Sequence, residues 1–73
     1  MARIAAIGEW LRIAGLASAG VVLRPAEEPE AVRTAWHGLA PEVELVIVTP
    51  TAAEALGDVL VDGQGPLVAV MPP

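Results

Sequence analysis

The fold is decided by residues 3–24, which read RIAAIGEWLRIAGLASAGVVLR. Residues 3–7 form a short apolar run that stops at Gly8, and residues 10–17 then repeat apolar side chains at helical spacing. A second apolar run covers residues 20–24. A strand, a tight turn, a short helix and a second strand form a βαβ unit, which predicts a parallel sheet.

Two further helices are expected after this unit. Pro29 suits the first turn of a helix, which we expect to run to residue 36 or 37. Thr51 and Glu54 have the spacing of a capping box and predict the start of a third helix. Each of the three helices has one apolar stripe, comprising Trp10, Ile13, Ala14 and Ala17, then Val32, Ala35, Trp36 and Leu39, then Ala52, Ala55, Leu56 and Val59. We therefore expect Trp10 and Trp36 to be largely buried against opposite faces of the sheet.

Two further strands complete the chain. Residues 43–48 are predominantly apolar, which is typical of a central parallel strand buried on both faces. Residues 62–66 predict a loop, and residues 67–71 predict the last strand. The element order βαβαβαβ predicts an α/β fold with three helices. Right-handed crossovers favour a four-stranded parallel sheet in the flavodoxin-like order 2-1-3-4, with the first helix on one face and the others opposite.

Composition limits the classes of protein that this chain can represent. Its 73 residues make one domain, residues 1–73, of which 55% are hydrophobic. The net charge is −5 and lysine is absent, so we expect no binding to nucleic acid or to an anionic membrane. There is no cysteine, no apolar run long enough to cross a membrane, and no stretch before the first strand that fits a signal peptide. These features are compatible with a cytosolic protein.

The candidate chemical motifs favour a structural interpretation. Gly8 is a single glycine before a helix, whereas a dinucleotide site needs three in a set spacing. A phosphoryl-receiver site would need an aspartate after the third strand and a lysine, and neither is present. His37 has no neighbouring nucleophile in the sequence and suits the end of a helix. We expect no enzymatic activity, no cofactor and no metal.

The first turn and helix resemble a known family. The chain reads Gly-Glu-x-x-Arg-x-x-Gly-Leu-x-Ser-Ala-Gly over residues 8–20, and this is similar to the opening of the F-subunit family of the V-type and A-type ATPases, Gly-Asp-x-x-Thr-x-x-Gly-Phe-x-Leu-Ala-Gly. The matching positions are Gly8, Gly15, Ala19 and Gly20, and Glu9 replaces the family's aspartate. The departures are Arg12, Leu16 and Ser18. The third and fourth strands also resemble the family's.

The resemblance implies a non-catalytic rotor-stalk component of a proton-translocating ATPase, cytoplasmic and peripheral to the membrane, with other ATPase subunits as partners. In that family a further helix follows the fourth strand and helps to dock the protein on the coiled-coil rotor shaft. The chain ends at Pro73 with no counterpart of that helix. The alternative is a free-standing flavodoxin-like module that self-associates. A third class, a small-ligand binder, would have only Glu9, Thr49 and Thr51 as polar groups at the strand ends.

The expected topology predicts an interaction surface. With one helix on its face, the sheet would be uncovered on one side of the third and fourth strands. Apolar side chains occupy both alternations of these strands, so an exposed patch follows for either register. We expect a homo-oligomer, most simply a symmetric dimer, or docking of a partner's helix at the same place. The candidate interface residues are Leu45, Ile47, Leu67, Val68, Val70 and Met71.

Overall fold

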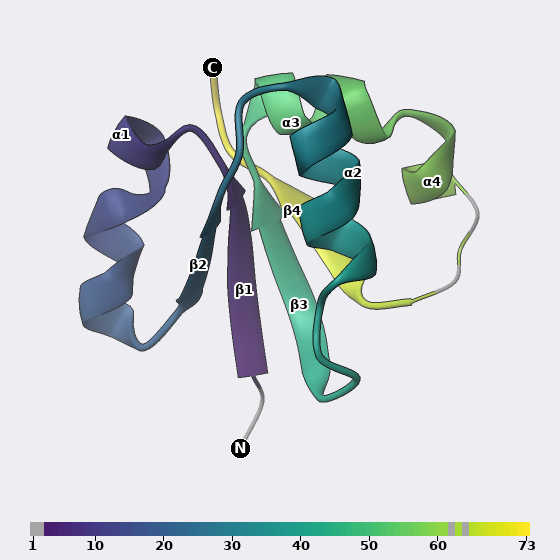
Figure 1. Cartoon of the computed structure of the whole chain (residues 1–73). Helices are drawn as coiled ribbons and strands as arrows, with labels where there is room; N and C mark the ends of the chain where they lie inside the picture. Colours follow the sequence, from purple (N-terminus) through teal and green to yellow (C-terminus); the bar gives the residue numbers. More distant parts are fainter. Residues whose placement is uncertain (1–2, 62, 64) are drawn as a thin grey trace.

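The chain folds as a four-stranded, all-parallel sheet with helical connections, as Figure 1 shows. The computed structural model describes residues 3–61, 63 and 65–73. The strands are β1 (Arg3–Gly8), β2 (Val22–Pro25), β3 (Val43–Val48) and β4 (Leu67–Val70). Their order is β2-β1-β3-β4, which confirms the predicted order 2-1-3-4. The second strand begins two residues later than expected, and two of the five predicted loop residues, 62 and 64, lie outside the described residues.

The helical connections are more divided than the sequence suggests. The first comprises α1 (Trp10–Ile13) and a 3₁₀ helix, η1 (Ala14–Ala19). The second is α2 (Pro29–His37), which confirms its predicted limits. The third breaks at Gly57 into α3 (Pro50–Leu56) and α4 (Asp58–Val61), because glycine interrupts the helix that the apolar stripe predicts as continuous.

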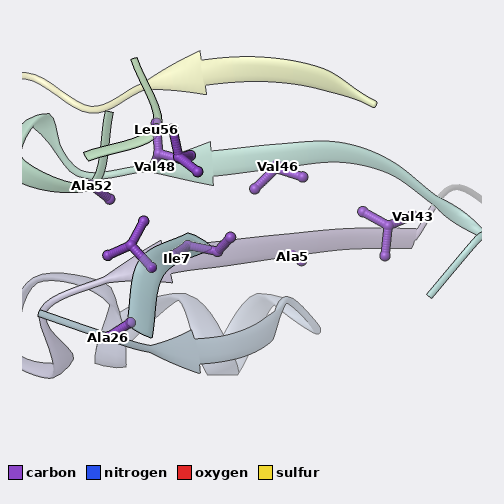
Figure 2. Close-up of a cluster of buried hydrophobic side chains, with 9 residues drawn as sticks. Ala5, Ile7, Ala26, Val43, Val46, Val48, Ala52 and Leu56 are labelled. Carbon is purple, nitrogen blue, oxygen red and sulfur yellow. The ribbon is translucent and has the colours of Figure 1, made fainter. Parts of the chain in front are cut away.

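Strand register assigns each side chain to one face of the sheet. Ala5 of β1 lies beside Val22 and Val46, and Val46 lies beside Val68, so these four residues share a face. The main core lies on this face, between the sheet and helices α2 and α3. Figure 2 shows the buried cluster, which consists of Ala5, Ile7, Ala26, Val32, Val43, Val46, Val48, Ala52 and Leu56; all but Val32 are labelled there.

The opposite face is covered by one connection. Right-handed crossovers place α1 and η1 on this face, where they contact β1 and β2. Ala6 and Ile13 are fully buried yet stand outside the main cluster, as expected for a second, smaller core. Leu45 and Ile47 of β3 are only half-buried. The prediction that β3 is buried on both faces was therefore only partly correct, because no second helix in the described part of the chain covers it on the α1 side.

The tryptophan predictions need correction. Trp36 is half-buried and packs against the main cluster. Trp10, in contrast, is 53% exposed, so its predicted burial was wrong. The first connection keeps α-helical geometry for only four residues before it tightens to a 3₁₀ helix. A 3₁₀ helix has three residues per turn, so the stripe predicted for a 3.6-residue period does not stay on one face, and Ala17 is also exposed.

Candidate functional site

A tight backbone approach joins β1 to the segment after β3. Gly8 is the last residue of β1, and Thr49 directly follows β3. The Thr49 amide donates to the carbonyl of Ile7 at 3.2 Å. A methyl group added at Gly8 would lie 2.6 Å from Thr49 Oγ1 and 2.9 Å from Thr49 Cβ. Gly8 is therefore required because the buried Thr49 side chain occupies the space that a Cβ would fill.

The Thr49 hydroxyl makes two hydrogen bonds. It donates to Glu9 Oε1 at 2.6 Å and accepts from the Ala52 amide at 3.3 Å. Thr49 is thus the N-cap of α3, with Pro50 in the first turn. The predicted capping box was wrong by two residues, since Thr51 lies inside the helix and is exposed. Two threonines surround Pro50, and the proline suits the first helical position after the cap.

Glu9 is held as a carboxylate by its surroundings. The hydrogen bond from the Thr49 hydroxyl lowers the pKa of Glu9 most. The backbone amide of Glu9 lowers this pKa further, and desolvation opposes it with a smaller effect. The Thr51 hydroxyl and the Arg12 guanidinium lower the pKa by still less. A carboxyl group with a lowered pKa is a poor proton donor at neutral pH. Glu9 therefore acts here as a hydrogen-bond acceptor that ties the first turn to the cap of α3.

This hydrogen bond can be tested by titration. We expect Thr49→Val to raise the pKa of Glu9, measured from its carboxyl carbon by NMR, and Thr51→Val to raise it less. The folded pKa lies below the unfolded one, so Glu9 contributes stability above the unfolded pKa, and this contribution is lost as pH falls through the folded value. An unchanged Glu9 pKa in Thr49→Val would contradict the assignment.

The two other glycines of the 8–20 motif, Gly15 and Gly20, differ in backbone conformation and in surroundings. Gly20 ends η1 with a left-handed backbone, φ 81°, which favours glycine. Gly15 lies within η1, and a Cβ there would meet nothing within 4 Å. Gly15 therefore makes no close approach to the sheet that would require glycine. Close packing in the 8–20 motif is concentrated at Gly8.

The predicted interface residues divide between the two faces of the sheet. Register places Leu45 and Ile47 beside Leu67 and Ala69 on the α1 side. We call these four residues the open face; the first two are half-buried and the last two exposed. Val68 belongs to the opposite face, where it packs against the main core.

The remaining two candidates lie at the carboxyl end of β4. Register places Val70 beside Val48, and its side chain is 54% exposed at the sheet edge. Met71 follows β4 and is half-buried. The Arg12 guanidinium donates to the carbonyl of Pro72 at 2.7 Å, so α1 contacts the chain end here while the open face stays uncovered.

Reactive groups are dispersed over the part of the chain that the structure describes. No group of three or more histidine, cysteine, aspartate or glutamate residues there could hold a metal ion. His37 is exposed at the end of α2, away from the carboxyl edge that bears Glu9 and Thr49. A hollow of about 570 Å³ lies at the opposite end of β3, beside Val43, Trp36 and Leu67. A second one, of about 400 Å³, lies near the carboxyl edge and is lined in part by Glu27, Thr51 and Glu54. The small-ligand class has Glu9, Thr49 and Thr51 at the strand ends, but both hydrogen-bonding functions of Thr49 are already used, one of them by Glu9.

Comparison with known proteins found no matching family model, no matching curated protein and no matching solved structure. Among the described helices, none has the length and apolar character needed to cross a membrane.

Proposed function

We propose that this chain is a non-catalytic protein-binding module that acts as the F-subunit family does in the V-type and A-type ATPases, by docking on a helical rotor-shaft partner. Two observations support the proposal: the Gly8–Gly20 motif of the sequence and the parallel sheet in the order β2-β1-β3-β4. The sheet supplies a rigid surface, and the proposed activity is contact with other ATPase components.

The open face is the observation that carries the proposal. Parallel sheets are normally covered by helices on both faces. Here α2 and α3 cover one face, whereas α1 and η1 cover only the β1 and β2 part of the other. The uncovered part is apolar and includes Leu67, which is 76% exposed. A helix from a partner would occupy the place that a second helix of the chain's own would fill.

The partner that fits best is an α-helix with one apolar stripe. The open face carries no charge on its own four residues, so its contribution to binding is burial of apolar surface. A helix of a two-stranded coiled coil presents such a stripe where the coil opens or ends. The protein would thereby join the membrane-peripheral part of an ATPase without entering the lipid.

Binding to the shaft can be measured directly. The probe is the purified central-stalk coiled coil of the host's V/A-type ATPase, titrated with this protein by calorimetry. We expect the double variant Leu45→Thr/Ile47→Thr to weaken binding at least 10-fold, because it removes apolar area while placing threonine, which suits a strand, at both positions of β3. Val61→Thr is the matched control, since Val61 lies on α4 and is 82% exposed.

Absence of binding by the wild-type protein at 100 µM shaft would refute the ATPase role. Equal affinities of the double variant and the wild type would place the contact elsewhere. The second candidate function is a self-associating module without an ATPase role. The neutral outer edge of β4 is the observation that favours it.

A further inference from the structure

The two edges of the sheet differ in their protection against pairing with another strand. On β2, the Ala26 amide donates inward to the Gly8 carbonyl at 2.9 Å. Amides alternate in direction along a strand, so the backbone nitrogen of Pro25 faces outward, where proline has no hydrogen to donate. Arg24 adds a charge to the same short strand. Proline and charge are the usual means by which natural sheets block edge pairing.

The edge strand β4 contains neither a proline nor a charged residue. The Met71 amide donates inward to the Val48 carbonyl at 2.8 Å. By the same alternation, the backbone groups of Ala69 point toward β3, and those of Val68 and Val70 point outward. Residues 66–73 include no charged side chain, and Pro72 comes only after the strand has ended. Within the described residues no strand pairs with this side of β4.

We propose that the outer edge of β4 binds the same edge of a second copy of this chain, in antiparallel orientation about a two-fold axis at Ala69. Val68 then lies opposite Val70 of the second copy, and Val70 lies opposite its Val68. Each of these is a hydrogen-bonded pair that exchanges two bonds. All the outward backbone groups of these residues are satisfied, which makes the edge self-complementary.

The side chains support the same register. The Ala69 residues of the two copies meet at a non-hydrogen-bonded position, where opposed side chains are closest and small ones fit best. Leu67, which is 76% exposed, lies opposite Met71 of the second copy and packs beside it. Val70, exposed at the edge, gains a cross-strand valine. The chain carries a net charge of −5, but residues 66–73 have no charged side chain, so the pairing brings no like-charged side chains of this segment together.

A second copy is the occupant that these observations favour. A symmetric interface requires one surface to be complementary to itself, and two outward residues flanking a central alanine meet that requirement. The pairing joins two sheets into one of eight strands. On the open face it adds neighbours only along β4, so Leu45 and Ile47 of β3 stay uncovered. The inference therefore holds whether or not the open face binds a coiled coil.

Sedimentation of the wild type and of a proline variant tests whether the outer edge of β4 forms the dimer. We expect the wild type to form a reversible dimer with a dissociation constant on the order of 10 µM, as is typical of small interfaces. Val70→Pro removes one outward amide hydrogen and leaves the β3–β4 bonds intact, so dimerisation should weaken at least 10-fold. Val70→Thr keeps the amide and the β-branched shape, and its dimer should persist within 3-fold. Circular dichroism checks that both variants fold.

Cross-linking tests the two-fold axis without relying on the proline variant. The chain has no cysteine, so Ala69→Cys introduces a single thiol close to its symmetry mate. We expect mild oxidation to link this variant at least 10-fold faster than Val61→Cys, whose thiol would lie on exposed α4. A wild type that stays monomeric at 500 µM would overturn the proposal. So would equal linking rates, or a dimer abolished by Leu45→Thr/Ile47→Thr and retained by Val70→Pro.

Discussion

Replacing Gly8 by alanine is expected to remove a large share of the stability of this domain. The added methyl group would lie 2.6 Å from Thr49 Oγ1 and 2.9 Å from Thr49 Cβ. Thr49 is fully buried and its hydroxyl is held by Glu9 and by the Ala52 amide, so it has no free direction of movement. Overpacking costs about 1–3 kcal/mol, and loss of the α3 cap adds about 1 kcal/mol.

The size of the domain makes this loss severe. Native proteins have about 0.05–0.15 kcal/mol of stability per residue, so 73 residues correspond to about 4–11 kcal/mol. Urea unfolding at 25 °C should show the variant losing about 2–4 kcal/mol. Gly15→Ala is the matched control, because a Cβ at Gly15 meets nothing within 4 Å, and its stability should stay within about 1 kcal/mol of the wild type. A Gly8→Ala stability within about 1 kcal/mol of the wild type would show that the turn relaxes freely.

The double variant Gly8→Ala/Thr49→Ala separates the clash from other effects. Thr49→Ala alone should cost about 1 kcal/mol by removing the cap of α3. In the Gly8→Ala background it also removes the hydroxyl and methyl groups that oppose the new side chain. The two losses should therefore sum to more than the loss in the double variant. Strict additivity would mean that Gly8 and Thr49 do not interact.

The strand order was predictable because hydrophobic pattern and crossover handedness together leave few arrangements. The stripe of α2 was also predictable, since Val32 is buried and Trp36 packs beside it. The geometry of the first connection could not be predicted in this way. Trp10 fits an α-helical stripe, but the α-helix ends at Ile13 and a 3₁₀ helix follows. Local tightening of a helix depends on how its few buried residues reach the sheet, and spacing alone does not contain that information.

The candidate site was recoverable only in part. The sequence selects Gly8 and Glu9 as a turn, but their contact with Thr49 joins residues about 40 positions apart. One signal was available: β1 and β3 are neighbours in the predicted order, so the residues that follow them meet at one edge. No feature of the sequence could show that Val68, which was predicted to lie in the interface, belongs to the core side of the sheet. Both alternations of β4 are apolar, and only the register places Val68 on the core side.

Replacing Ile13 by alanine is expected to detach the first connection from the sheet. Within residues 10–19, all of which the structure describes, Ile13 is the one buried side chain. Truncating a buried isoleucine to alanine costs about 2–5 kcal/mol, depending on how far the site collapses. A short helix with no other buried anchor has little stability of its own, so the loss should appear there first.

Hydrogen exchange and urea unfolding distinguish local from global effects of Ile13→Ala. Amides of residues 10–19 should exchange faster by 10-fold or more, and the free energy of unfolding should fall by at least about 2 kcal/mol. Leu11→Ala is the matched control on the same turn, because Leu11 is 91% exposed and its removal leaves no cavity. The main core between the sheet and α2–α3 excludes Ile13, so the amides of Val46 and Val48 should accelerate only as far as the fall in the global free energy of unfolding requires. Equal effects of the Ile13 and Leu11 variants would show that α1 is not anchored through Ile13, and that its position depends on the Arg12–Pro72 contact instead.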